Sequence, residues 1–266
     1  DTQVQPKVSV AFKATDNMLM YANYGKGYRT GGFNQGQTVR YGTDFSAETT
    51  DNYEIGIKNT YWDNRFILNF SGYYIDFTNQ QLYALVLDGG AGQILIGNFN
   101  VPESISVGFE ADMRLRATNW LDILASYGVS KSRIERGTST ESTGTNTTID
   151  VSGNATPLVP QDSYSLGLES SFDISDKITF NGNVNLEGTG EIYWHEDNAA
   201  ASSRYSLLNA RMNFTFNKFT VGIWGTNLTD TEYITEFFDQ TFSNGGSDLA
   251  WLGQPTAFGV NLSYKF

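Results

Sequence analysis

The chain has 266 residues, no cysteine, 27 glycines and a formal net charge of -12, and 17% of its residues are charged although its mean hydropathy is -0.34. Soluble domains carry about 25% charged residues; here Asn, Ser, Thr, Gly, Tyr and Phe replace them, a mixture that favours strands and tight turns over helices. The composition excludes disulfides, thiolate metal sites and cysteine nucleophiles, its acidity argues against nucleic-acid partners, and no stretch approaches the roughly 20 apolar residues of a membrane-spanning helix.

Along the chain, apolar and polar residues alternate with period two, which predicts strands that have one apolar and one polar face. Strands of soluble sandwiches average about five to six residues, whereas these runs approach the roughly 9–11 residues that cross a bilayer at a tilt. We therefore expect the apolar face to contact lipid and the polar face to line a watery or plugged lumen. The eleven expected strands are 6–15, 18–28, 48–61, 65–80, 93–117, 120–135, 161–173, 177–194, 203–217, 218–229 and 254–266.

The connections between these strands alternate between short turns and long loops, as in bacterial outer-membrane barrels with short periplasmic turns and long outer loops. The short turns are 15–17, 62–65, 118–120, 174–177 and 217–218, and the long loops are 28–48, 88–92, 136–160, 195–203 and 230–254. Aromatic residues crowd the short turns and predict a periplasmic-side girdle: Trp62, Phe66, Trp120, Phe172, Phe180, Phe216, Phe219 and Phe266. Bacterial single-chain barrels have an even number of strands, so an odd number suggests the C-terminal piece of a longer barrel.

Two segments have less regular patterns. Pro102 interrupts the long run 93–117, so we expect either a kink at this residue or a strand that begins near Ser104. The Ser/Thr-rich segment from Thr138 to Thr148 has little apolar surface to bury, and we expect it to be mobile.

Four motifs, in order along the chain, resemble the C-terminal barrel region of TonB-dependent outer-membrane receptors. The first runs from Tyr21 to Asn34 and combines a Tyr-rich strand with a basic residue, a Gly pair and Phe-Asn. The second is the strand from Glu48 to Lys58, and the third is Asn-Leu-Thr-Asp-Thr-Glu-Tyr from Asn227 to Tyr233. The last is the alternating terminus from Gly253 to Phe266. Together they extend the resemblance over essentially the whole chain, 1–266.

This resemblance implies an all-β transmembrane antiparallel barrel of about 22 strands around a plug, of which this chain supplies half. It implies location in the bacterial outer membrane, contacts with lipid and lipopolysaccharide, and energy from the TonB-ExbB-ExbD complex. The chain lacks a plug and a TonB box, so we expect a second chain or an upstream segment to supply them with the other barrel half. The most frequent cargo of the family is a ferric siderophore. The terminal alternation implies a signal for the barrel-assembly machinery, formed by Phe258, Val260, Leu262, Tyr264 and Phe266.

Candidate ligand-binding residues lie in the expected outer loops, where aromatic and arginine side chains can hold anionic, catechol-like or glycan ligands. They are Tyr28, Arg29, Phe33, Arg40, Tyr41, Trp194, His195 and Trp251. The alternative is that the aromatics form an outer girdle. His195, Glu196 and Asp197 raise the option of a metal contact, but adjacent residues of an extended chain point to opposite sides, and a solvated loop is favoured.

On the polar face, Glu110, Asp112, Arg114 and Arg116 follow one another in a single strand. They fit either a plug-docking or permeation network or a solvated wall with cross-strand ion pairs. No nucleophile, base or oxyanion site accompanies them, so we expect no enzyme activity, and neither a metal nor a cofactor. The acidic loop residues Asp44, Asp197, Asp239 and Asp248 suggest divalent-cation contacts near lipopolysaccharide. Alternative functions are a self-contained passive porin or adhesin and a soluble carbohydrate-binding protein.

Overall fold

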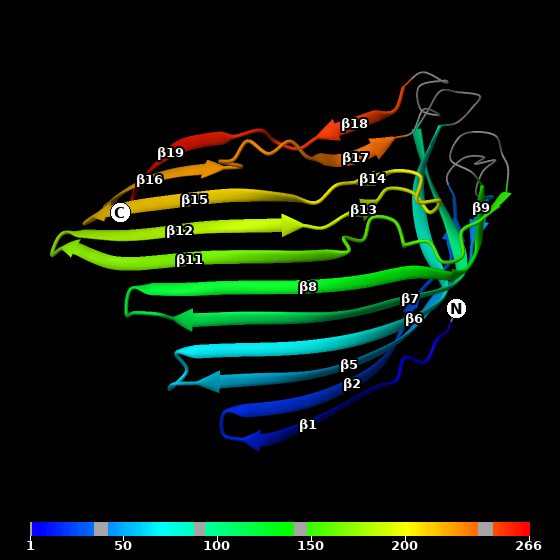
Figure 1. Cartoon of the computed structure of the whole chain (residues 1–266), viewed down its shortest axis with the longest axis horizontal. Helices are drawn as coiled ribbons and strands as arrows, with labels where there is room; N and C mark the ends of the chain where they lie inside the picture. Colours follow the sequence, from blue (N-terminus) through cyan, green and yellow to red (C-terminus); the bar gives the residue numbers. More distant parts are fainter. Residues whose placement is uncertain (1, 35–41, 88–93, 141–147, 239–246) are drawn as a thin grey trace.

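The computed structural model describes residues 2–34, 42–87, 94–140, 148–238 and 247–266. One antiparallel sheet of 11 strands forms a single curved layer, in which the strands follow one another in chain order (Figure 1). These strands are β1 (Lys7–Thr15), β2 (Met18–Arg29), β5 (Glu48–Tyr61), β6 (Phe66–Leu87), β7 (Ile94–Arg116), β8 (Leu121–Arg136), β11 (Asp162–Ser175), β12 (Ile178–Thr189), β15 (Tyr205–Phe216), β16 (Phe219–Thr226) and β19 (Ala257–Tyr264). Among the described residues, no helix is long and apolar enough to cross a membrane.

The long connections contain short ribbons that the sequence did not predict. Four two-stranded sheets stand beyond the ends of the main strands (Figure 1). They are β3 (Gly32–Phe33) with β4 (Asp44–Phe45), β9 (Thr138–Thr140) with β10 (Thr148–Asp150), β13 (Ile192–Tyr193) with β14 (Ala201–Ser202), and β17 (Ile234–Phe238) with β18 (Leu249–Leu252). The two ends of the segment expected to be mobile thus form a hairpin, and residues 141–147 lie outside the described residues.

The two predicted faces of the sheet are confirmed by the register of its strands. One cross-strand row is apolar throughout and joins Leu68, Met113, Ala125, Leu166, Leu186 and Leu208. The next row lies one residue away along each strand, points to the other face and is polar: Asn69, Asp112, Ser126, Ser165 and Glu187. Because side chains alternate between faces, this register makes each face nearly uniform in chemistry.

Several predicted strand boundaries are wrong. β6 does not end at residue 80 but pairs with β7 as far as Leu87, so this hairpin extends outward beyond its neighbours. β12 ends at Thr189 rather than 194, although Gly190 N still donates to Asp162 O at 2.7 Å before the chain enters β13. β16 ends at Thr226 because Asn227 adopts a φ of 48° and its side chain bonds two loop carbonyls.

Pro102 lies within β7, which continues through it, so the strand does not begin near Ser104. On the β6 side, Asn79 has a φ of 54° and takes no part in the pairing between Thr78 and Gln80. On the β8 side, the register shifts between Glu103 and Ser104. The expected irregularity is therefore a bulge, which accommodates a residue without an amide hydrogen.

Aromatic rings gather at the short-turn end of the sheet, as predicted. Trp62 and Phe66 stack with centroids 5.4 Å apart, and Trp120 meets Phe172 edge-on at 5.9 Å. The row of rings continues across the following strands: Phe180 contacts Phe172, and its centroid lies 5.3 Å from that of Phe214. This chain of rings is the girdle expected where an outer-membrane wall meets the membrane interface.

A wall one sheet thick encloses no central core, and the buried apolar cluster lies elsewhere. It occupies the outward extension of β6, β7 and β8, where β10 and the residue after it cover them. Its members are Leu82, Phe99, Val101, Ile134 and Val151, with Ile149 packed against them. The apolar side chains along the main strands are instead exposed; Leu262, for example, is 79% exposed. This exposure is what a lipid-facing surface requires.

Candidate functional site: the polar wall and the outer loops

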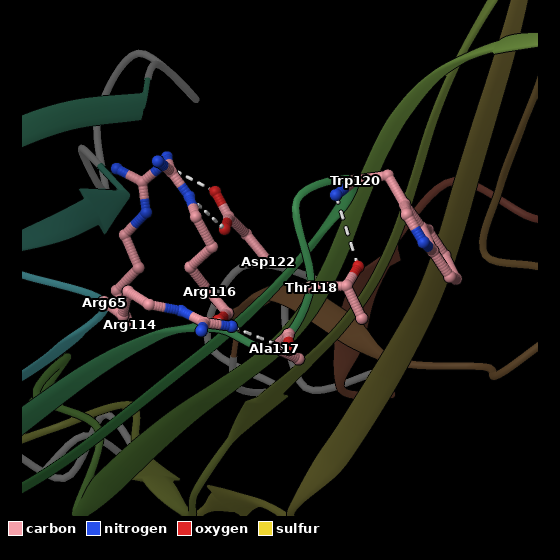
Figure 2. Close-up of polar contacts among 7 residues, drawn as sticks. All are labelled: Arg65, Arg114, Arg116, Ala117, Thr118, Trp120 and Asp122. Carbon is pink, nitrogen blue, oxygen red and sulfur yellow. Dashed lines mark hydrogen bonds and ion pairs between the residues drawn. The ribbon is translucent and has the colours of Figure 1, made fainter. Parts of the chain in front are cut away.

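The β7–β8 hairpin concentrates charge on the polar face. Asp122 Oδ2 accepts from Arg114 Nη2 at 2.6 Å, and Asp122 Oδ1 from Arg116 Nε at 3.3 Å (Figure 2). The Asp122 side chain is only 15% exposed, whereas the guanidinium groups reach further into solvent. Arg65, from the turn before β6, donates to the carbonyls of Arg116 and Ala117, both at 3.2 Å (Figure 2). The two turns are thereby tied together beneath the charged cluster.

Strand register extends this cluster across the wall. Arg116 is opposite Asp122, and the same row continues through Glu169 and Asn183 to Arg211 on β15. These side chains line a hollow of about 520 Å³. In the part of the chain that the structure describes, neither Glu169 nor Arg211 forms an ion pair. Glu169 also interacts electrostatically with Arg114, so the base of the row, Arg211, is the charge without a partner of opposite sign among the described residues.

A second hollow, of about 690 Å³, lies on the same face of β5, β6 and β7. Glu110 and Asp112 line it, and Asn69 Nδ2 donates to Asp112 Oδ1 at 3.0 Å. Lys58 also lines it and sits over the Tyr21 ring, 5.6 Å from the centroid. All four predicted lumen-facing residues thus occur on one polar face. Glu110 and Asp112 border one hollow, Arg116 borders the other, and Arg114 is tied to Asp122.

The first outer loop is docked onto the extended β6–β7 hairpin by amide side chains. Gln81 Nε2 donates to Thr30 O at 2.9 Å and to Ser46 O at 3.0 Å. Asn34 and Asn98 are joined twice, since Asn34 Nδ2 donates to Asn98 O at 2.9 Å and Asn98 N donates to Asn34 Oδ1 at 2.7 Å. Asn34 lies in a motif that the sequence singled out, but partners 64 residues away leave no local signal.

Two further loops, 136–160 and 195–203, join around Glu196, which is only 2% exposed. Ser139 donates to its carboxylate, and Asn154 Nδ2 donates to its backbone oxygen at 2.9 Å. Asn198 completes the junction, because its side chain accepts from Ala155 N at 2.7 Å and donates to Ala155 O at 2.9 Å. The sequence raised a metal contact at Glu196 as an option and favoured a solvated loop, whereas the structure buries Glu196 and uses it to tie β9 to the loop after β13.

The predicted ligand-binding residues differ in accessibility. Phe33 and Trp251 are 85% and 65% exposed, whereas Trp194 is 7% exposed. The His195 ring meets Phe237 at 6.2 Å, which brings the last long loop onto this junction. Tyr28 and Arg29 end β2, and Arg40, Tyr41 and Asp239 lie outside the described residues. Among the described residues, no group of three or more His, Asp or Glu side chains is placed to hold a metal ion.

Outside the membrane-spanning strands, hydrogen bonds shift the pKa values of three side chains. The Asp162 carboxylate accepts from Arg204 Nη1 at 2.6 Å and Nη2 at 2.5 Å, and this pairing raises the pKa of Arg204. Hydrogen bonds from Ser152 lower the pKa of Asp150, because they favour its ionised form. A hydrogen bond to Glu191 raises the pKa of Tyr193. Of these pairs, Asp162 with Arg204 links the start of β11 to the residue before β15, whereas the other two are contacts between residues two positions apart.

The sequence model of the family described as "TonB dependent receptor-like, beta-barrel" matches residues 1–228. The chain belongs to this family. Members of the family are outer-membrane β-barrel proteins, which agrees with the girdle and the exposed apolar face. Similar solved structures include the ferric yersiniabactin uptake receptor FyuA from Yersinia pestis, with a TM-score of 0.79 and 20% identity over 99% of this chain and 37% of that one. Another is the siderophore receptor PiuA from Acinetobacter baumannii, with a TM-score of 0.72 and 19% identity over 98% of this chain and 35% of that one.

The chain therefore spans between a third and two-fifths of the length of these two receptors. At such identities the likeness concerns the fold. The resemblance drawn from the four sequence motifs and the outer-membrane location are both confirmed by the family match.

Proposed function

We propose that this chain forms the C-terminal half of the barrel of a receptor that imports a ferric siderophore with TonB-coupled energy. The observation that carries the proposal is the family match over residues 1–228, together with a wall of 11 strands that has two polarised faces. The similar structures are those of a ferric yersiniabactin uptake receptor and a siderophore receptor, which supports a siderophore as the cargo.

The edges of the wall support a second segment that closes the barrel. Among the described residues, β1 pairs only with β2, and β19 pairs only with β16. Unpaired strand edges are not tolerated in a bilayer, because no water satisfies their amide and carbonyl groups. In this proposal the closing segment also brings the plug and the TonB box, and the apolar positions of β19 through Phe266 act as the signal for the barrel-assembly machinery.

The open charges of the polar wall support docking of the plug. Glu110 and Arg211 lie on the polar face and form no ion pair within the described part of the chain. Charged groups at an interface position a partner and favour one orientation. In our proposal, these groups meet complementary charges on the plug, whereas the Arg114–Asp122–Arg116 cluster is satisfied within the wall and keeps the hairpin rigid.

The outer loops support capture of a bulky ligand. Phe33 and Trp251 expose their rings on ribbons that are held in place by the loop network. An aromatic ring that is already positioned loses little conformational entropy when a flat ligand stacks on it. We propose that these rings contribute to the siderophore site, with Arg29 at the end of β2 as a source of positive charge.

The experiment is uptake of radiolabelled iron by an iron-limited deletion strain that expresses the complete receptor. Catecholate, hydroxamate and mixed-ligand siderophores are supplied separately. We expect one class to restore growth, and deletion of TonB to abolish uptake while whole-cell binding persists. Uptake that continues without TonB would indicate a passive porin, and unchanged growth with every class under iron limitation would reject iron import.

The ligand site has a matched pair of variants. Trp251→Ala removes an exposed ring from the outer ribbon, whereas Trp62→Ala removes a ring of 68% exposure from the short-turn girdle. Stacking on one ring contributes about 0.5–1.5 kcal/mol, so we expect Trp251→Ala to weaken siderophore binding about 2- to 13-fold. Equal binding by the Trp251→Ala and wild-type receptors would remove Trp251 from the site, and Trp62→Ala should bind as wild type does.

A further inference from the structure

One buried glutamine joins the two arms of the first outer loop at its root. The loop leaves the wall after Arg29 and returns to it at Glu48. Gln81, on the outward extension of β6, is only 7% exposed, and its Nε2 donates to Thr30 O at 2.9 Å and to Ser46 O at 3.0 Å. We call this junction of one amide with two carbonyl groups the loop clamp. It connects the start of the outgoing arm with the end of the returning arm.

The clamp uses only the donor side of the glutamine. Gln81 Oε1 is buried and has no hydrogen-bond partner among the described residues. A buried acceptor without a donor costs free energy, and the two hydrogen bonds from Nε2 offset that cost. The position therefore requires a donor, because a carboxylate of the same shape would bring two acceptors against the carbonyl oxygens of Thr30 and Ser46.

Two asparagines hold the arms at further points, and each pairs with both backbone groups of a single residue. Asn100, on β7, accepts from Ser46 N at 2.7 Å and donates to Ser46 O at 3.1 Å. Asn34 pairs in the same way with the backbone of Asn98. In each case a side-chain amide takes the place of a peptide group in an antiparallel ladder. Both arms are thereby fixed to the extended β6–β7 hairpin.

Phe33 lies between these fixed points, directly after a pair of glycines. A Cβ on Gly31 would lie 2.5 Å from Phe45 O, and one on Gly32 would lie 2.7 Å from Phe45 Cζ, so the outgoing arm packs closely against the returning arm. Gly32 is opposite Phe45 in the β3–β4 ribbon, and the ring of Phe33 therefore points to the other side, where it is 85% exposed. The points at which the arms are held thus determine where this exposed ring stands.

We propose that Gln81 is a positioning residue for Phe33, because the loop clamp holds the ring where a flat ligand can stack on it. This inference rests on the proposed function, in which Phe33 contributes to the siderophore site. Gln81 is buried beneath the loop and acts through the position of the arms rather than by contact with the cargo. A loop that is fixed before the cargo arrives loses less conformational entropy on binding, so the clamp increases affinity.

Hydrogen exchange on the complete receptor in detergent, without siderophore, tests the clamp itself. Gln81→Glu replaces the donor by a second acceptor of the same shape, and Gln81→Met removes the donor without adding a charge. Gln80→Glu is the matched control one residue away, because Gln80 Oε1 accepts from Ser104 Oγ at 2.6 Å and a carboxylate accepts equally well. Heat-modifiable electrophoresis establishes that each barrel has assembled, and Gln81→Met keeps the test open if the charged variant fails to assemble.

The returning arm reports the state of the clamp, because its Ser46 amide is protected by Asn100. We expect peptides that cover 42–48 to exchange several-fold faster in both Gln81 variants, and at the wild-type rate in Gln80→Glu. Wild-type exchange at 42–48 in Gln81→Met would overturn the clamp, as would an equal acceleration in Gln80→Glu.

A double-mutant cycle tests whether the clamp acts through Phe33. The Kd is measured with the ferric catecholate, hydroxamate and mixed-ligand siderophores of the uptake experiment, for wild type, Gln81→Met, Phe33→Ala and the double variant. Phe33→Ala removes one stacked ring and should raise the Kd about 2- to 13-fold. We expect Gln81→Met to raise the Kd by no more than this factor, and to have no further effect in Phe33→Ala, because no ring is left to position.

An effect of Gln81→Met that persists undiminished in Phe33→Ala would overturn the positioning role, since a general loss of structure acts independently of the ring. Wild-type affinity in Gln81→Met would overturn it as well. Wild-type affinity in Phe33→Ala would reject the Phe33 site of the proposed function, and the positioning role with it. The clamp is judged by exchange without any siderophore, so a failure of the clamp and a failure of the proposed function are distinguishable.

Discussion

The buried cluster at the outer end of β6, β7 and β8 offers a direct test of how the outer loops are held. Ile134 is 0% exposed, and its Cγ2 lies 3.1 Å from the position that a Cβ on Gly137 would take. Ile134→Ala removes buried methyl and methylene groups and leaves a cavity in a small cluster. Substitutions of this kind cost about 2–5 kcal/mol.

The loss of stability in Ile134→Ala should open the β9–β10 hairpin locally rather than unfold the whole wall. The β9–β10 hairpin has three residue pairs and lies outside the main sheet, and an isolated hairpin is marginal in water. It is attached through Val151 N to Gly137 O at 3.0 Å and Gly153 N to Ile134 O at 2.7 Å. A loss of 2–5 kcal/mol corresponds to an about 30- to 4,000-fold increase in the opened population of this unit.

Hydrogen exchange with mass spectrometry on the receptor in detergent measures this opening. We expect peptides that cover 148–154 to lose protection in Ile134→Ala, while β15 and β16 keep theirs. Ile223→Ala is the control. Ile223 is 51% exposed on the lipid face of β16 and does not belong to the buried cluster, so its truncation leaves that cluster intact. Unchanged exchange at 148–154, or an equal loss of protection in β15, would refute the reasoning.

Two further predictions concern charged groups. Asp122→Asn leaves Arg114 and Arg116 without their shared carboxylate, so the free energy of unfolding, followed by thermal unfolding in detergent, should fall by about 1–2 kcal/mol; an unchanged transition would contradict the role of Asp122. Because hydrogen bonds from Ser152 lower the pKa of Asp150, the folded hairpin gains stability above the ordinary carboxyl pKa and loses it as the pH falls through the lowered value. Exchange protection of the Ser152 amide, corrected for intrinsic rates, should fall on acidification in the wild type and not in Asp150→Asn, and equal behaviour of the two proteins would count against this linkage.

Most of the wall was predictable because its information is local. Period-two alternation identifies a strand with two faces without reference to any other strand, as the terminus from Phe258 to Phe266 illustrates. All 11 strands of the main sheet overlap the expected segments. The errors lie at the outer ends, where pairing continues beyond the membrane in β6 or stops early in β12, because hydrogen bonds between loops decide where those strands end.

The candidate site was predictable only in part, for a related reason. Alternation placed Glu110, Asp112, Arg114 and Arg116 on the polar face, and the structure agrees. The carboxylate that pairs with the two arginines is Asp122, on the next strand. Asp122 reaches them because of the register between β7 and β8, which neither strand determines alone.

The sequence by itself determined that this is an all-β wall with one apolar and one polar face, with aromatic residues at its short turns and long connections at the other end. Side-chain alternation and turn chemistry act over a few residues, so they can be recognised without any tertiary contact. Only the tertiary structure decided which charges become partners, such as Asp122 with its arginines, and which have no ion-pair partner among the described residues, such as Arg211. It also decided that Asn34 meets Asn98 and that Glu196 meets Ser139, because such contacts join chain segments far apart in sequence, which only the folded chain brings together.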